Sequence, residues 1–150
     1  MDDIDRKILR TLQDHPEMPL ADLAPLVGLS QTPCWRRLKK LESQGTIRGR
    51  AVLLDPAMLG LTVNVFAYIK LKSHDEATLE ALESAVEKHS EIIECFSMSG
   101  DSDYLLRVIV ASVEAYERFL KRELLHLPGV GSINSSFALK RVKETTVLPI

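Results

Sequence analysis

The sequence is poor in the residues that mark secreted and membrane-spanning proteins. It has two cysteines in 150 residues, too few for a disulfide scaffold, and we expect Cys34 and Cys95 to be small buried hydrophobes. No apolar run approaches the roughly 18 residues of a membrane span, so no membrane partner is expected. The opening residues, MDDIDRKILRTLQ, begin with acidic side chains and are amphipathic. They are unlike a signal or transit peptide, which predicts a cytoplasmic protein.

The net charge of the chain is also small, but its charged side chains are unevenly distributed. The formal net charge of −2 argues against a generally basic nucleic-acid binder. Residues 31–50, however, contain six basic side chains and one acidic side chain, whereas residues 61–150 contain ten basic and thirteen acidic ones. One basic segment on an otherwise acidic chain predicts a local contact surface for a polyanion.

The first third of the chain reads as a compact helical domain. Apolar residues at helical spacing predict helices over residues 4–12 and 20–27 and a third that follows Ser30 as its N-cap and runs to about residue 44; Gly28 is placed to end the second of them. Residues 46–53 are expected to be extended, as a strand or two. Three helices followed by such a segment predict a winged helix-turn-helix.

The rest of the chain reads as an alternation of strands and helices. The pattern predicts the order βαββαβ, with strands over 61–71, 92–98, 104–110 and 133–142 and helices over 75–89 and 113–127. This order is typical of a ferredoxin-like sandwich, so the fold class is α+β. We expect a DNA-binding domain over 1–54, a linker over 55–61 and a second domain over 62–150. Strands 63–71 and 104–110 are apolar on both faces, which predicts an obligate homodimer.

The third helix is the candidate reader of double-stranded DNA. A turn of 100° per residue places Cys34, Leu38 and Leu41 on its inward face and polar and cationic side chains on the opposite face. Such a face suits the major groove and its flanking phosphates. Trp35 either faces the DNA or packs on the first helix. The alternative to DNA binding is that the cationic face is only solvated. The DNA-binding candidates are Ser30, Gln31, Thr32, Trp35, Arg36, Arg37, Lys39, Lys40, Arg48 and Arg50.

Several strings of the sequence resemble one family along essentially the whole chain. They are IDRKIL (4–9), VGLSQTPCWRRLKKLE (27–42), SGDSDYLL (99–106) and LPGV (127–130). These strings resemble the leucine-responsive regulatory protein/AsnC, or feast/famine, family of transcription regulators. The ending SSFAL (135–139) with TTVLPI (145–150) is most similar to a branch that includes regulators of cysteine detoxification.

The resemblance implies a sensor domain that binds a small amino acid, and a dimer that assembles further into tetramers or octamers. A carboxylate such as Asp101 or Asp103 would accept hydrogen bonds from the ligand ammonium, and N–H groups of a glycine turn would bind its carboxylate. The alternative is that Gly100-Asp101 is only a hairpin turn. The effector-site candidates that the resemblance implies are Met98, Gly100, Asp101, Asp103, Tyr104, Ser135 and Ser136.

An enzyme and an architectural DNA-binding protein are the two alternatives to a regulator. An enzyme is disfavoured because Asp101 and Asp103 point apart, no histidine joins them, and the sequence has no zinc spacing, phosphate loop or nucleophile motif. We therefore expect no catalysis, no cofactor and no metal. A nucleoid-like architectural protein that binds DNA without an effector stays open. Among effectors, leucine, methionine and cysteine are all compatible with the sequence.

Overall fold

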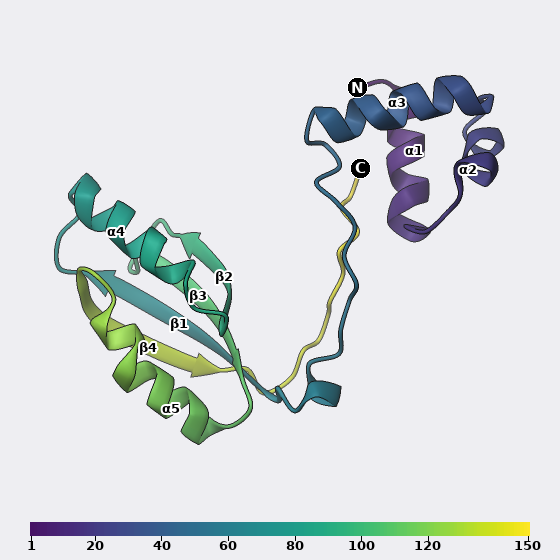
Figure 1. Ribbon diagram of the computed structural model, residues 1–150. Helices are drawn as coiled ribbons and strands as arrows, with labels where there is room; N and C mark the ends of the chain where they lie inside the picture. The colour runs from purple at the N-terminus through teal and green to yellow at the C-terminus, as the bar shows by residue number, and fades with distance from the viewer. The chain divides into compact units, whose positions relative to one another are not determined.

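The computed structural model describes residues 1–150, which form two units (Figure 1). The helical unit comprises Met1–Leu53 together with Val142–Ile150, and the sheet unit comprises Leu54–Arg141. Each unit has its own buried apolar cluster. No helix is both long enough and apolar enough to cross a membrane.

The helical unit contains α1 (Asp3–Asp14), α2 (Leu20–Leu26) and α3 (Gln31–Ser43). A capping box starts α1: the N–H of Asp5 donates to Asp2 Oδ1 (2.9 Å) and the N–H of Asp2 donates to Asp5 Oδ2 (3.1 Å). These two bonds satisfy backbone donors that a helix start otherwise leaves unpaired. The three helices pack around Ile8, Leu23, Ala24, Val27, Cys34 and Leu41.

A Schellman motif joins α2 to α3. Gly28 has a φ of 77°, and its N–H donates to the carbonyl of Pro25 (3.1 Å). The N–H of Leu29 donates to the carbonyl of Ala24 (2.9 Å). A side chain is disfavoured at this φ, so glycine is the residue that turns the chain sharply from α2 into α3. The predicted helix end at Gly28 is confirmed.

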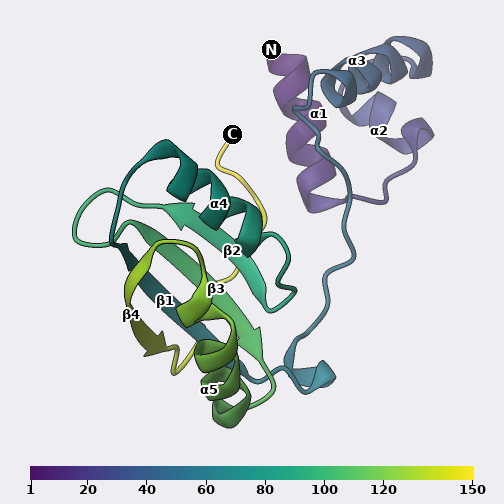
Figure 2. The same cartoon turned by 60° about the vertical axis from the view of Figure 1, so that its left-hand side comes forward.

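The sheet unit has the predicted βαββαβ order. Its elements are β1 (Val63–Leu71), α4 (Glu76–Val86), β2 (Ile92–Ser97), β3 (Tyr104–Val110), α5 (Val113–Arg122) and β4 (Val130–Phe137), with 3₁₀ turns at Ala57–Leu59 and Leu124–His126. The strands are antiparallel in the order β2-β3-β1-β4. Both helices lie on the same face of this sheet (Figure 2). The predicted ferredoxin-like fold is thereby confirmed.

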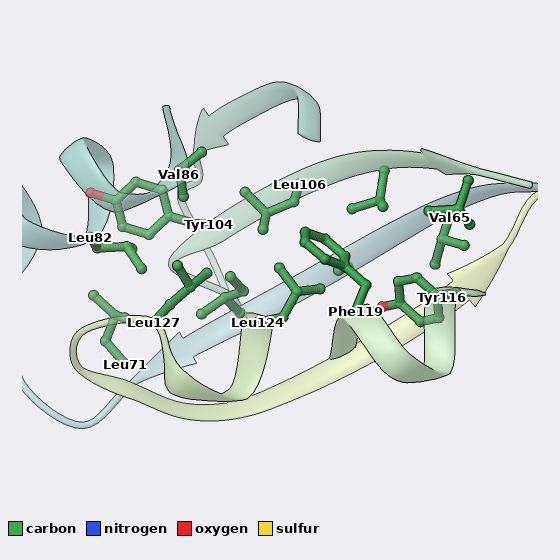
Figure 3. Packing of buried hydrophobic residues seen from close by; sticks show 14 residues of the cluster. Val65, Leu71, Leu82, Val86, Tyr104, Leu106, Tyr116, Phe119, Leu124 and Leu127 are labelled. Atoms are coloured by element: carbon green, nitrogen blue, oxygen red, sulfur yellow. The ribbon is translucent and has the colours of Figure 1, made fainter. Parts of the chain in front are cut away.

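The core lies between this face and the two helices. Every second residue of β3, from Tyr104 to Val110, is buried. Figure 3 shows Leu82 of α4 and Phe119 of α5 pointing towards the sheet, with Leu106 of β3 between them. The alternation along β3 is the period-two pattern of a strand with one face against a core.

The opposite face of the sheet has no helix over it. Arg107 donates to Glu94 Oε2 (3.0 Å) and to Asn64 Oδ1 (3.3 Å), which joins three strands across the face. Around this polar group lie apolar side chains, half-buried or exposed: Phe66, Tyr68, Phe96, Leu105 and Ile109. Such a face is apolar enough to pack against another sheet.

Two expected elements differ in the structure. No strand forms over 46–53, so the predicted wing is absent. Thr46 and Ile47 belong to the turn after α3, where the N–H of Ile47 donates to the carbonyl of Leu41 (3.1 Å), and residues 48–53 pair with no strand of the chain. The last strand starts at Val130 and ends at Phe137, not at 133 and 142. It starts early because Val130 pairs with Leu71, and it ends at the residue that pairs with Val65 in β1.

Two further expectations concern Cys95 and the end of the chain. Cys34 is fully buried as predicted, but Cys95 is exposed because β2 is an edge strand with β3 as its one neighbour. The second domain over 62–150 stays a prediction, and in the structure Val142–Ile150 groups with the helical unit. The reason lies in side-chain contacts of the tail with α1, such as the pairing of Gln13 with Leu148.

Candidate DNA-binding and effector sites

The exposed face of α3 carries the polar and cationic residues expected there. Thr32, Arg36 and Lys40 are exposed, and the latter two line a shallow hollow beside the start of α1. Cys34 and Leu41 are buried on the opposite side of the helix. The helix therefore presents hydrogen-bond donors and positive charge outward while its apolar stripe holds it to α1 and α2.

Arg37 does not share this outward role in the structure. Its Nη1 donates to Asp2 Oδ2 (2.6 Å) and to Asp5 Oδ1 (2.8 Å), the two carboxylates of the capping box. The N–H of Asp5 and then Arg37 hold the pKa of Asp2 below its ordinary value, and the same carboxylates raise the pKa of Arg37. This ion pair ties the middle of α3 to the start of α1.

The remaining DNA-binding candidates differ in solvent exposure and in whether their side chains have a partner in the chain. Lys39 Nζ lies 2.7 Å from Glu42 Oε2 on the same helix. Trp35 is 49% exposed, so about half of its surface faces solvent. The other four candidates are exposed: Ser30, Gln31, Arg48 and Arg50.

The effector candidates before β3 lie in one loop between β2 and β3. The N–H of Met98 donates to the carbonyl of Asp103 (2.8 Å), and the N–H of Asp103 donates to the carbonyl of Ile69 in β1 (2.8 Å). Gly100 has a φ of 115°, a conformation that favours glycine. These bonds close the base of the loop and leave its tip exposed at Asp101.

The two aspartates of the loop have different surroundings. Asp103 Oδ2 accepts the N–H of Leu71 (2.7 Å), and Asp103 Oδ1 lies 2.8 Å from His74 Nε2. The N–H of Leu71, followed by His74, lowers the pKa of Asp103. Asp101 is exposed and has no hydrogen-bond partner in the chain. The expectation that no histidine joins these carboxylates is thus wrong, because the loop after β1 brings His74 against Asp103.

Three other effector candidates point away from the loop tip. Tyr104 is buried on the helix side, where its hydroxyl donates to Glu83 Oε1 (2.6 Å), and burial followed by Glu83 raises its pKa to about 12. Ser135 lies on the same side, 2.5 Å from the hydroxyl of Tyr116. Ser136 pairs with Phe66 on the opposite face.

The structure therefore does not bring all seven effector candidates together within one chain. Met98, Gly100, Asp101 and Asp103 share the loop, whereas β4 is two strands from β3, about 10 Å across the sheet. The part of the site in the loop is preformed, and the serines of β4 belong to another region of the same sheet.

The residues that sequence reasoning missed act through long-range contacts. The pairing of His74 with Asp103 and that of Tyr104 with Glu83 each join positions at least 21 residues apart. The capping pair of Asp2 and Asp5 could have been read, since a carboxylate three residues after an N-cap residue is a sequence signature. No group of three or more histidine, cysteine and carboxylate side chains is arranged to hold a metal ion.

Comparison with known proteins identifies both units. The AsnC-type helix-turn-helix domain matches residues 1–42, and the Lrp/AsnC ligand-binding domain matches residues 64–148. The chain belongs to the Lrp/AsnC family. Over its full length it is 41% identical to the DNA-binding transcriptional activator DecR of Escherichia coli, of which it covers 99%. Its placement in a cysteine-detoxification branch of the family stays a prediction.

Solved structures of the Lrp/AsnC family agree over nearly the whole chain. A regulator of the AsnC family from Agrobacterium tumefaciens superposes with a TM-score of 0.92 at 46% identity, covering 99% of this chain and 97% of that one. A transcriptional regulator from Neisseria meningitidis, crystallised in complex with L-Met, has a TM-score of 0.92 at 36% identity and covers 99% of this chain and 96% of its own. The family assignment and the fold thus rest on sequence and structure together.

Proposed function

We propose that this protein is a transcription regulator that binds double-stranded DNA through α3 and whose activity or assembly responds to a small amino acid. The observation that carries the proposal is the exposed cationic face of α3, which follows the Schellman turn. This helix belongs to an AsnC-type helix-turn-helix domain, and the same chain contains an Lrp/AsnC ligand-binding domain. Because its target is DNA, we assign it to the cytoplasm.

Residues on α3 divide into readers and a positioning residue. Thr32, Arg36 and Lys39 face outward, where a major groove would offer base edges and phosphates. Arg37 is held by Asp2 and Asp5 and so orients α3 instead of contacting DNA. The supporting DNA contacts that we propose come from the ends of the helix and the extended segment: Ser30, Gln31, Trp35, Lys40, Arg48 and Arg50.

The effector is proposed to bind at the loop between β2 and β3. Asp101 is the free carboxylate there, so we assign it as acceptor for the ligand ammonium, whereas Asp103 holds the loop to β1 through Leu71. Backbone N–H groups near Gly100 would bind the ligand carboxylate. The L-Met complex of the Neisseria relative supports an α-amino acid as the ligand class.

The uncovered face of the sheet is proposed to form the homodimer. Apolar side chains such as Phe66 and Phe96 surround Arg107 on this face, and two sheets can pack across it. Further assembly into tetramers or octamers would bring other copies to the effector loop. We propose that Met98, Tyr104, Ser135 and Ser136 contribute to the site through such assembly or by supporting the loop.

Calorimetric titration with L-Met, L-Leu and L-Cys tests the effector site. The wild-type protein should bind at least one of them, and Asp101→Asn should weaken that binding about tenfold or more, since a charge-assisted hydrogen bond to the ligand ammonium is lost. Asp22→Asn is the matched control: the same chemistry at an exposed aspartate of α2. Equal binding by Asp101→Asn and the control would refute the assignment of Asp101.

A further inference from the structure

The last residues of the chain lie against α1 of the helical unit (Figure 1). The side-chain amide of Gln13 pairs with both backbone groups of Leu148: Nε2 donates to the carbonyl (3.2 Å) and Oε1 accepts the N–H (2.6 Å). One helical turn earlier, Arg10 Nε donates to the carbonyl of Ile150 (2.5 Å). Residues three apart lie on one side of a helix, so the side chains of Arg10 and Gln13 can bind the tail together.

The tail has a defined shape where it meets α1. The N–H of Val147 donates to Thr145 Oγ1 (3.1 Å), and the N–H of Ile150 donates to the carbonyl of Leu148 (2.9 Å) around Pro149. Proline fixes its own φ, which limits the conformations that the tail loses on docking. Leu139, which lies further from α1, is 100% exposed. The bonds of Arg10 and Gln13 therefore hold the tail at its last residues.

The tail and the interdomain linker start from the same place on the sheet unit. The N–H of Ala138 donates to the carbonyl of Asn64 (2.9 Å), so the tail leaves β4 beside the start of β1, where the linker enters. The helical unit thus has two covalent connections to the sheet unit, after Leu53 and before Val142.

We propose that the outer face of α1 at Arg10 and Gln13 is a docking surface for this chain's own tail, residues Val147–Ile150, which makes the tail a second tether of the DNA-binding unit. Resting on the proposed function, the tether gives β4, which carries two effector candidates, a direct connection to the helix-turn-helix. The common origin of tail and linker favours the chain's own tail over that of a second copy.

Hydrogen exchange of the full-length protein tests the docking itself. The Leu148 amide should be protected in the wild type and in Lys7→Ala, a control on α1 that removes an exposed cation without touching the tail. In Gln13→Ala its exchange should accelerate about fivefold, the value of one net hydrogen bond. Leu148 exchange at the free-peptide rate in the wild type would overturn the proposal.

Cross-linking distinguishes the chain's own tail from that of a second copy. In a Cys95→Ala background, Asp14→Cys with Val147→Cys places thiols beside the Gln13–Leu148 pair, and a short bismaleimide should link them within one chain. Cys34 stays in every variant because it is fully buried. Covalent dimers from a mixture of the two variants that each carry one added cysteine, with no link within the double variant, would overturn assignment to the same chain.

The role as a tether is tested by deleting residues 147–150. Amino-acid binding by calorimetry should be unchanged, while the shift that the amino acid causes in DNA affinity should fall at least threefold. An unchanged shift would overturn the role as a tether. If the wild type binds no amino acid, the proposed function fails, and the exchange experiment still decides the docking.

Discussion

Replacing Arg36 and Arg37 separately by alanine compares two neighbouring arginines that have different surroundings in the structure, and for which we propose different roles. Arg36 is exposed on the outward face of α3, whereas Arg37 Nη1 lies 2.6 Å from Asp2 and 2.8 Å from Asp5. Both changes remove the same charge from the same helix. They differ in whether the charge faces solvent, where we propose that DNA binds, or a carboxylate pair of α1.

The expected effects follow from these partners. Loss of a base or phosphate contact costs about 1–3 kcal/mol of binding free energy, or about 5- to 150-fold in affinity. If Arg36 binds a phosphate, its loss also lowers the slope of log affinity against log salt by about one. Arg37→Ala should instead lower the melting temperature, because Asp5, whose side chain is 13% exposed, loses its cation.

Fluorescence anisotropy of labelled operator DNA at several salt concentrations, together with thermal unfolding, gives both readouts. Arg36→Ala should change affinity with little change in melting temperature, and Arg37→Ala should do the reverse while its salt slope stays at the wild-type value. A salt slope that falls equally in both variants would refute the division of roles. Arg37→Lys should recover part of the lost stability, since a lysine keeps the charge but not the forked geometry.

Three other predictions concern the sheet unit. Leu106→Ala, at a fully buried position, should destabilise the unit by about 2–5 kcal/mol in urea unfolding, and a loss under about 1 kcal/mol would contradict its place in the core. Absorbance titration should show one tyrosine ionising near pH 12, and this ionisation should be missing in Tyr104→Phe. Because the pKa of Tyr104 is raised on folding, its contribution to stability is present below pH 10 and is lost between pH 10 and 12. The pKa of Asp103 is lowered from 3.8, so its hold on Leu71 should persist above that pH and be lost as the pH falls further; the Leu71 amide shift should titrate there in the wild type but not in Asp103→Asn.

Features set by local chemistry could be predicted from the sequence. Gly28 had to end α2 because its neighbours supply the helical pattern and only glycine favours the left-handed turn. Strand β3 was predicted with its observed bounds, Tyr104–Val110, because its apolar residues are framed by a turn and a helix cap. The inward position of Cys34 followed from helical periodicity alone.

Features that depend on distant partners could not be predicted. Gln13 and Leu148 are 135 residues apart, so no local pattern reveals that the tail joins the helical unit. The prediction of a wing was wrong because a strand forms only where a partner strand exists. Residues 46–53 have no partner strand in the chain. Arg37 looked like its neighbours on α3, and only the packing of α1 shows that it faces Asp2 and Asp5.

The central claim is that DNA binding by α3 responds to an amino acid at the sheet unit. Anisotropy of the purified protein on its own upstream DNA, at fixed salt and titrated with each common amino acid, tests it most directly. One or a few amino acids should shift the affinity or the stoichiometry of binding. Tight binding that no amino acid shifts, with steep salt dependence and little sequence preference, would contradict the claim and indicate an architectural DNA-binding protein.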